Sequence, residues 1–264
     1  MTSEKRTSEK RTSKKRAAEH YAAEAEILKL ARVLGVEPAR LEYLARVDAD
    51  DLQAFREQVT DTLFDANAAA LQRMALAARV VPVGVLAKIA EKVFGPLLCA
   101  RIAGLVDVSR GVDVAKRLTP RFLAEVAAEL DPRRASAIIT RIPLDTVLAV
   151  AAELTRQEDW ITLGRFVGHL PDLTVRRALE RIDDPALLRI AFVLDDKRRI
   201  DHVVGLLPAH RLGRLVTAAS ADEDLWAPAL DLLTHLGEAR RATLKPMLSG
   251  LPAGFRERVQ ATIG

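Results

Sequence analysis

The chain has 264 residues, of which 49% are apolar and 29% charged, and its formal net charge is +4. This composition excludes the disordered and collagen-like classes and supplies enough apolar surface for a substantial core. The single cysteine, Cys99, excludes an internal disulfide and a cysteine-based zinc site, which is typical of a reducing compartment. Aromatic residues make up only 4% of the chain, so the core must be aliphatic, and such a composition favours helices.

Residues 1–16 form a basic tail made of three related pentapeptides, TSEKR, TSEKR and TSKKR. Seven basic residues against two glutamates give the tail a charge of +5, so the remaining 248 residues sum to −1. We expect the tail to be disordered, because ordering costs about 1–2 kcal/mol per residue and no side chain here can enter a core. It either binds an anionic partner, nucleic acid or membrane, or only solubilises the chain; the candidate residues are Lys5, Arg6, Lys10, Arg11, Lys14, Lys15 and Arg16.

No apolar run of leader-peptide type follows the tail. No stretch reaches the roughly 20 uninterrupted apolar residues that a membrane-spanning helix needs. We therefore expect a soluble, cytoplasmic protein.

Residues 28–47 resemble the centre of a helix-turn-helix unit, with Gly35 as the turn and a second helix starting near Pro38. Against DNA reading, acidic residues follow at positions 48, 50 and 51, and the amide and hydroxyl side chains that read base edges are missing. An ordinary helical hairpin is the favoured interpretation. In the DNA-reading alternative the second helix would offer Arg40, Glu42, Tyr43 and Arg46.

Residues 74–106 are the most apolar stretch, and the charges embedded in it sum to +3. Pro82 and Gly84 argue against a strand over Val80–Val85, although valines are frequent there. We favour a central pair of buried helices, because helices that are apolar on most sides usually lie in the interior. The alternative is an amphipathic hairpin on a membrane surface, with Arg79, Lys88, Glu91, Lys92 and Arg101 as the embedded charges.

From residue 117 onward, short helices follow one another at fairly regular intervals. Proline after a capping residue marks helix starts at Thr119-Pro120, Asp131-Pro132 and Asp184-Pro185. An aliphatic residue directly before a proline marks helix ends. The prolines are Pro143, Pro171, Pro208 and Pro252, and successive ones are 28, 37 and 44 residues apart. Together these marks predict about eleven helices of roughly 10–14 residues each.

Each of these helices carries one apolar stripe and is too short to persist alone. Stripes with i, i+3, i+4, i+7 spacing begin at Ile27, Ala135, Leu144, Leu187, Ile200 and Leu244. Stacking as successive antiparallel hairpins would bury every stripe, which predicts a degenerate α-solenoid of armadillo or HEAT type. A compact helical bundle is the alternative.

The segment Phe122–Ala135, FLAEVAAELDPRRA, followed by IITRIP over Ile138–Pro143, resembles the amino-terminal superhelical domain of MgtE-type magnesium transporters. It also resembles the armadillo-like helices of the flagellar motor switch protein FliG. The resemblance covers about residues 117–210 and implies a right-handed superhelix of short helices. The transporter's nucleotide-binding-like domains and membrane helices have no counterpart here, so the resemblance does not imply transport.

No residue pattern indicates catalysis or a cofactor. The acidic clusters Asp183-Asp184, Asp195-Asp196 and Asp222-Glu223-Asp224 each precede a predicted helix, so we interpret them as helix caps rather than cation sites. The five histidines lack metal-ligand spacing, and no nucleophile elbow or phosphate loop occurs. We therefore expect no enzyme activity, no cofactor and no metal.

The sequence predicts an all-α protein with a disordered basic tail (1–16), an amino-terminal helical region (17–116) and an α-helical repeat domain (117–264). The favoured function is a non-enzymatic cytoplasmic scaffold or adaptor that binds a protein partner on its extended helical surface. Two alternatives stand beside it: a nucleic-acid-associated protein that uses the tail and the 28–47 hairpin, and a peripheral membrane protein that uses residues 74–106.

Overall fold

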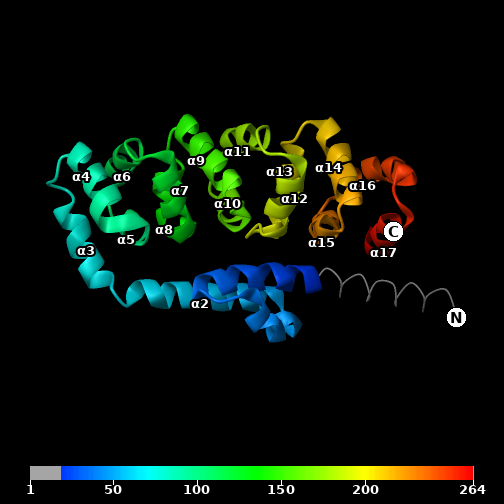
Figure 1. Ribbon diagram of the computed structural model, residues 1–264, viewed down its shortest axis with the longest axis horizontal. Helices are drawn as coiled ribbons and strands as arrows, with labels where there is room; N and C mark the ends of the chain where they lie inside the picture. The colour runs from blue at the N-terminus through cyan, green and yellow to red at the C-terminus, as the bar shows by residue number, and fades with distance from the viewer. Residues whose placement is uncertain (1–18, 264) are drawn as a thin grey trace. The chain divides into compact units, whose positions relative to one another are not determined.

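A computed structural model describes residues 19–263, and this part of the chain is helical with no β-strand (Figure 1). The predicted all-α class is therefore confirmed. The valine-rich segment 80–85 is a turn that leads into a helix, as its proline and glycine indicate. The basic tail predicted at 1–16 lies outside the described residues.

The packing divides the chain into two compact units. The central unit is Gln58–Ile182, and the terminal unit combines the residues up to Glu57 with those from Asp183 onward. The division at residue 57 falls inside α2 (Ala49–Asp65). The predicted segments 17–116 and 117–264 follow spacing along the chain, whereas these units follow packing, so their boundaries are not the same.

In the central unit, helices pack on the second helix further along the chain. α3 packs on α5, α5 on α7, α7 on α9 and α9 on α11, while α4 packs on α6 and α6 on α8 (Figure 1). The elements are α3 (Ala68–Ala77), α4 (Val83–Ile89), the π-helical turn η2 (Ala90–Phe94), α5 (Gly95–Ala103), α6 (Val108–Ala115), α7 (Pro120–Glu129), α8 (Pro132–Ile139), α9 (Leu144–Arg156), α10 (Trp160–Val167) and α11 (Asp172–Leu179).

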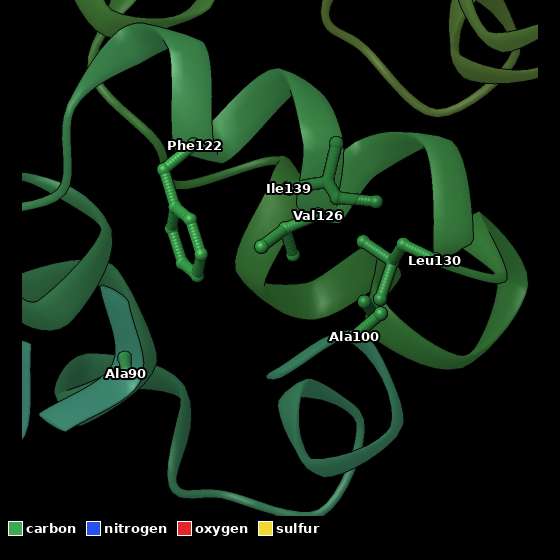
Figure 2. Packing of buried hydrophobic residues seen from close by; sticks show 7 residues of the cluster. Ala90, Ala100, Phe122, Val126, Leu130 and Ile139 are labelled. Atoms are coloured by element: carbon green, nitrogen blue, oxygen red, sulfur yellow. The ribbon is translucent and has the colours of Figure 1, made fainter. Parts of the chain in front are cut away.

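Small and large side chains alternate in the core of the central unit. Alanines from η2 and α5 lie against larger residues from α7 and α8, which lets the helix backbones approach closely (Figure 2). The labelled members of this cluster are Ala90, Ala100, Phe122, Val126, Leu130 and Ile139.

The terminal unit joins helices from both ends of the described chain. A helix at 19–34 buries Ile27, Leu30 and Ala31 against Leu41 and Leu52. Further along, α12 packs on α14 and α15, and α15 packs on α17. The other elements are the 3-10 helix η1 (Pro38–Arg46), α12 (Asp184–Phe192), η3 (Lys197–Arg199), α13 (Ile200–Gly205), α14 (Ala209–Ala221), η4 (Glu223–Leu225), α15 (Trp226–Thr234), α16 (Glu238–Leu244), η5 (Lys245–Gly250) and α17 (Ala253–Ile263).

The capping residues begin the helices largely as predicted. Thr119 accepts a hydrogen bond from the Phe122 amide at the start of α7, and Asp131 accepts one from the Arg133 amide at the start of α8. The third start is displaced by one residue, because Asp183 rather than Asp184 caps α12. The described chain from 117 onward contains eleven α-helices, α7 to α17, with 6–13 residues each, and seven of them are shorter than the predicted 10–14 residues.

One predicted helix is interrupted. The stripe that begins at Leu244 indicates a continuous helix to Leu251, but α16 ends at Leu244 and the 3-10 helix η5 follows. Pro246 explains the break, since it lacks an amide hydrogen and its ring clashes with the carbonyl four residues earlier in an α-helix. The aliphatic residues before the helix-ending prolines, which we expect to be buried because they end apolar stripes, are only half-buried, at positions 142, 170, 207 and 251.

Candidate functional site: an exposed apolar and basic surface

The most apolar stretch of the sequence is not interior, so the favoured interpretation of residues 74–106 as a buried helix pair is wrong. Its buried residues are mainly alanines, at positions 75, 78, 87, 90 and 100. Five of its larger side chains are exposed, and Val80 and Val93 among them are 86% and 72% exposed. The other large apolar side chains are half-buried, apart from the buried Ile102. The alanine face packs because small side chains let neighbouring helices approach, and part of the valine and leucine surface is left uncovered.

We call the outward side chains of α3, α4, η2, α5 and their connections the apolar-basic surface. Its exposed large apolar members are Leu76, Val80, Val85, Val93 and Leu97, and its exposed basic members are Arg73, Arg79, Lys88 and Lys92. Positions 85, 88 and 92 have i, i+3, i+7 spacing across the continuous helix formed by α4 and η2. They therefore lie on one side of that helix.

The acid within this surface is engaged by the neighbouring helix start. The Glu91 carboxylate accepts hydrogen bonds from the Thr119 amide at 2.7 Å and from the Thr119 hydroxyl at 2.8 Å. These bonds lower the pKa of Glu91 and fix η2 to the start of α7. Within the described chain, by contrast, the side chains of Arg79 and Lys88 have no ion pair or hydrogen bond.

A second, smaller exposed patch lies on α11. Leu173 is 60% exposed, and it is the one large apolar side chain exposed between residues 98 and 246 of the described structure. Arg176 and Arg177 are also exposed, and they follow Leu173 at i+3 and i+4. The three side chains therefore share one face of α11.

The 28–47 hairpin exists, but its second element is not an α-helix. The helix at 19–34 ends at a turn in which Gly35 has a φ of +65°, a conformation that glycine adopts without strain. The following element, η1, is a 3-10 helix, whose narrower shape differs from the recognition helix of the DNA-reading alternative. All four residues named for that role, Arg40, Glu42, Tyr43 and Arg46, are exposed.

The acidic clusters have two roles, of which the sequence analysis recognised one. Asp183, Asp196 and Asp222 each cap a helix, accepting a backbone amide hydrogen bond. Asp184 and Asp195 instead form ion pairs with residues distant in sequence. Asp184 pairs with Arg211, and both side chains are buried.

The half-buried Asp195 belongs to a network of four charges in the terminal unit, and its three partners are buried. Arg56 donates to Glu26 through Nε and to Asp195 through Nη2, each at 3.0 Å, and Lys29 Nζ lies 3.0 Å from the same Asp195 oxygen. Lys29 also pairs with Glu26. Two acids and two bases thus balance within a volume where Lys29 is only 1% exposed. This network fixes the helix at 19–34 against the segment after α12.

A second buried pair lies on the same unit. Lys197 donates to Asp231, whose side chain is fully buried. Burial lowers the pKa of Lys197, and the Asp231 carboxylate opposes this shift. The lysine Nζ also donates to the carbonyls of Ala191 and Phe192 at the end of α12. These three acceptors engage the ammonium group fully, so the pair is a structural link between α12, η3 and α15.

The remaining candidates give no site. Burial raises the pKa of Cys99 to about 11, so its thiol is protonated at neutral pH. Among residues 19–263, no group of three or more His, Cys, Asp or Glu side chains is arranged to hold a metal ion. None of the described helices has the length and apolar character needed to cross a bilayer. The seven basic residues of the tail, from Lys5 to Arg16, lie outside the described residues.

Sequence reasoning therefore missed the buried charges and predicted residues 74–106 to be more buried than they are. Comparison with family models, curated proteins and solved structures finds no match to this chain.

Proposed function

We propose that the chain is a non-enzymatic cytoplasmic scaffold or adaptor that binds a protein partner on the surface of a degenerate α-solenoid. The observation that carries this proposal is the packing order in the central unit, where α3, α5, α7, α9 and α11 each contact the next member of the series. Repeat proteins bury their apolar stripes between neighbouring repeats in this manner and leave a long ridged surface outside.

The exposed face of α11 is the part of that surface best suited to a protein partner. Arginine is enriched at protein interfaces, and a leucine flanked by two arginines combines apolar area with hydrogen-bond donors. Leu173 stands alone as an exposed large apolar residue over this part of the described chain, so covering it on binding would remove apolar area from water.

The test begins with affinity capture from the source cells, followed by identification of the captured protein and titration of its purified form against this chain. The variant Leu173→Asp with Arg176→Glu alters the α11 face, and Lys88→Glu with Lys92→Glu is the matched control on the apolar-basic surface. We expect the α11 variant to weaken binding of the purified partner at least about ten-fold and the control to leave it unchanged. Equal binding by all three proteins would contradict the assignment to α11.

A further inference from the structure

We propose that the apolar-basic surface of α3, α4, η2 and α5 binds the interface of an anionic lipid bilayer. This inference is independent of the adaptor function, because it concerns other residues and another class of partner. It begins from the exposed valines and leucines, which in a free protein would remain against water.

The apolar part of the surface is suited to an interfacial depth. Val80, in the connection before α4, and Val93, on η2, are the two most exposed large apolar side chains of the central unit. α4 and η2 together cover residues 83–94, a continuous helical length of about 18 Å at 1.5 Å per residue. This is too short to cross a bilayer, but it is sufficient to lie in the headgroup region with one face buried.

The charges of the surface complement anionic headgroups. Arg79, Lys88 and Lys92 are exposed among the apolar side chains, and two of them have no protein partner in the described chain. The acid nearby, Glu91, is bonded to Thr119 on the adjoining helix start. The three cations thus remain available for phosphate groups, and each basic residue near an anionic membrane contributes about five-fold to the partition coefficient.

The composition favours a lipid partner over a protein at this surface. Lysine is depleted at protein–protein interfaces, where tyrosine, tryptophan and arginine provide most of the binding energy. Here two of the four exposed basic residues are lysines, the exposed large apolar residues are all aliphatic, and tyrosine and tryptophan are absent from residues 68–103. Basic residues beside aliphatic ones are instead typical of amphipathic helices that lie on membranes.

The first experiment is flotation of the full-length chain with vesicles of phosphatidylcholine, alone or mixed with phosphatidylserine. We expect co-flotation only with the mixed vesicles. Lys88→Glu with Lys92→Glu should reduce the partition coefficient at least about 25-fold, the product of two five-fold contributions, and Val80→Ser with Val93→Ser should reduce it several-fold. The matched controls are Arg181→Glu and Leu173→Ser, which change an exposed basic and an exposed apolar residue elsewhere.

The second experiment measures contact directly. A polarity-sensitive dye attached to Val80→Cys should shift to shorter wavelength with mixed vesicles, whereas the same dye at Leu173→Cys should not. Cys99→Ser in the background removes the one native thiol, so the dye labels the introduced cysteine alone. No shift at Val80→Cys, or equal flotation of all variants, would overturn the proposal; in the latter case the basic tail alone carries the binding.

If the Lys88 and Lys92 variant instead lost a captured protein and bound lipid unchanged, the surface would be a protein interface. A lack of lipid binding leaves the α11 assignment intact, because that assignment is tested by Leu173→Asp with Arg176→Glu, and the Lys88 and Lys92 variant is only its control.

Discussion

Removing Lys29 tests whether the buried charges hold the amino-terminal helix in place. Lys29 is 1% exposed, and its ammonium group contacts both Glu26 and Asp195. The substitution Lys29→Met keeps most of the side-chain volume but leaves two carboxylates to share the single guanidinium of Arg56. The network then carries one uncompensated negative charge, and the terminal unit should lose stability.

The geometry sets the size of this loss. Breaking a buried ion pair typically costs about 3–5 kcal/mol, because the remaining charge is left without a partner. Arg56 stays within 3.0 Å of an oxygen of each carboxylate, so part of the charge remains balanced. We therefore expect the lower end of that range, about 3 kcal/mol. Adding Glu26→Gln restores the charge balance and should recover part of the loss.

The assay is urea unfolding followed by the fluorescence of Trp226, which lies on α15 of the terminal unit. Trp160→Phe in the background removes the signal of the central unit. The change in free energy follows from the shift in the transition midpoint and its slope. Arg40→Met, at an exposed site of the same unit, is the control and should cost under about 0.5 kcal/mol. If Lys29→Met cost no more than Arg40→Met, the network would not be what fixes the helix.

Three further predictions concern stability. Gly111→Ala should lower the free energy of unfolding by about 1 kcal/mol in a thermal melt, because a Cβ there would lie 2.5 Å from Ile138 Cδ1. Gly84→Ala on α4 meets open space, so it should raise the free energy of unfolding by about 0.5–1 kcal/mol. Arg211→Met should lower the free energy of unfolding by about 3 kcal/mol, because it leaves the buried Asp184 with only the exposed Arg214. Arg214→Met should cost under about 1 kcal/mol, and equal losses for the two variants in urea unfolding would contradict this. The hydrogen bond from the Gly237 amide and the Arg240 guanidinium hold the pKa of Asp201 below its ordinary value of 3.8. The Asp201 carboxylate therefore stabilises the fold above pH 3.8, and this stabilisation is lost as the pH falls through the lower, folded-state pKa. Asp201→Asn should therefore cost about 0.2–1 kcal/mol at neutral pH, a range that allows for solvent screening, and nothing at the acid end of a pH series of unfolding midpoints.

The helix starts could be predicted because their causes are local. Thr119 and Asp131 cap helices through amides two or three residues away, and both residues precede a proline that suits the first turn. The docking of the helix at 19–34 depends on Asp195, 166 residues away from Lys29. No local pattern contains that information, so the composition of the terminal unit could not be inferred from spacing.

The outward face of residues 74–106 was available in the sequence but was obscured by counting apolar residues together. Ala87 and Ala90 are three residues apart and both are buried, while Val85, Lys88 and Lys92 share the opposite side. Alanine and valine are both apolar, yet Ala87 and Ala90 are buried whereas Val85 is exposed. Placing each apolar residue around the helix, instead of counting them together, separates the buried alanine side from the exposed side.

The buried charges also had a signal in the sequence. Ala23, Glu26 and Leu30 have i, i+3, i+7 spacing, so the glutamate occupies a position within the apolar stripe. Aliphatic stripes recur along this chain with the same spacing, and one such stripe resembles another in shape and chemistry. A helix docked one turn out of place would still bury apolar area, but it would leave Glu26 or Lys29 buried without its partner. We infer that these charges determine where the helix docks more than how strongly it binds, and the recovery expected when Glu26→Gln joins Lys29→Met follows from this.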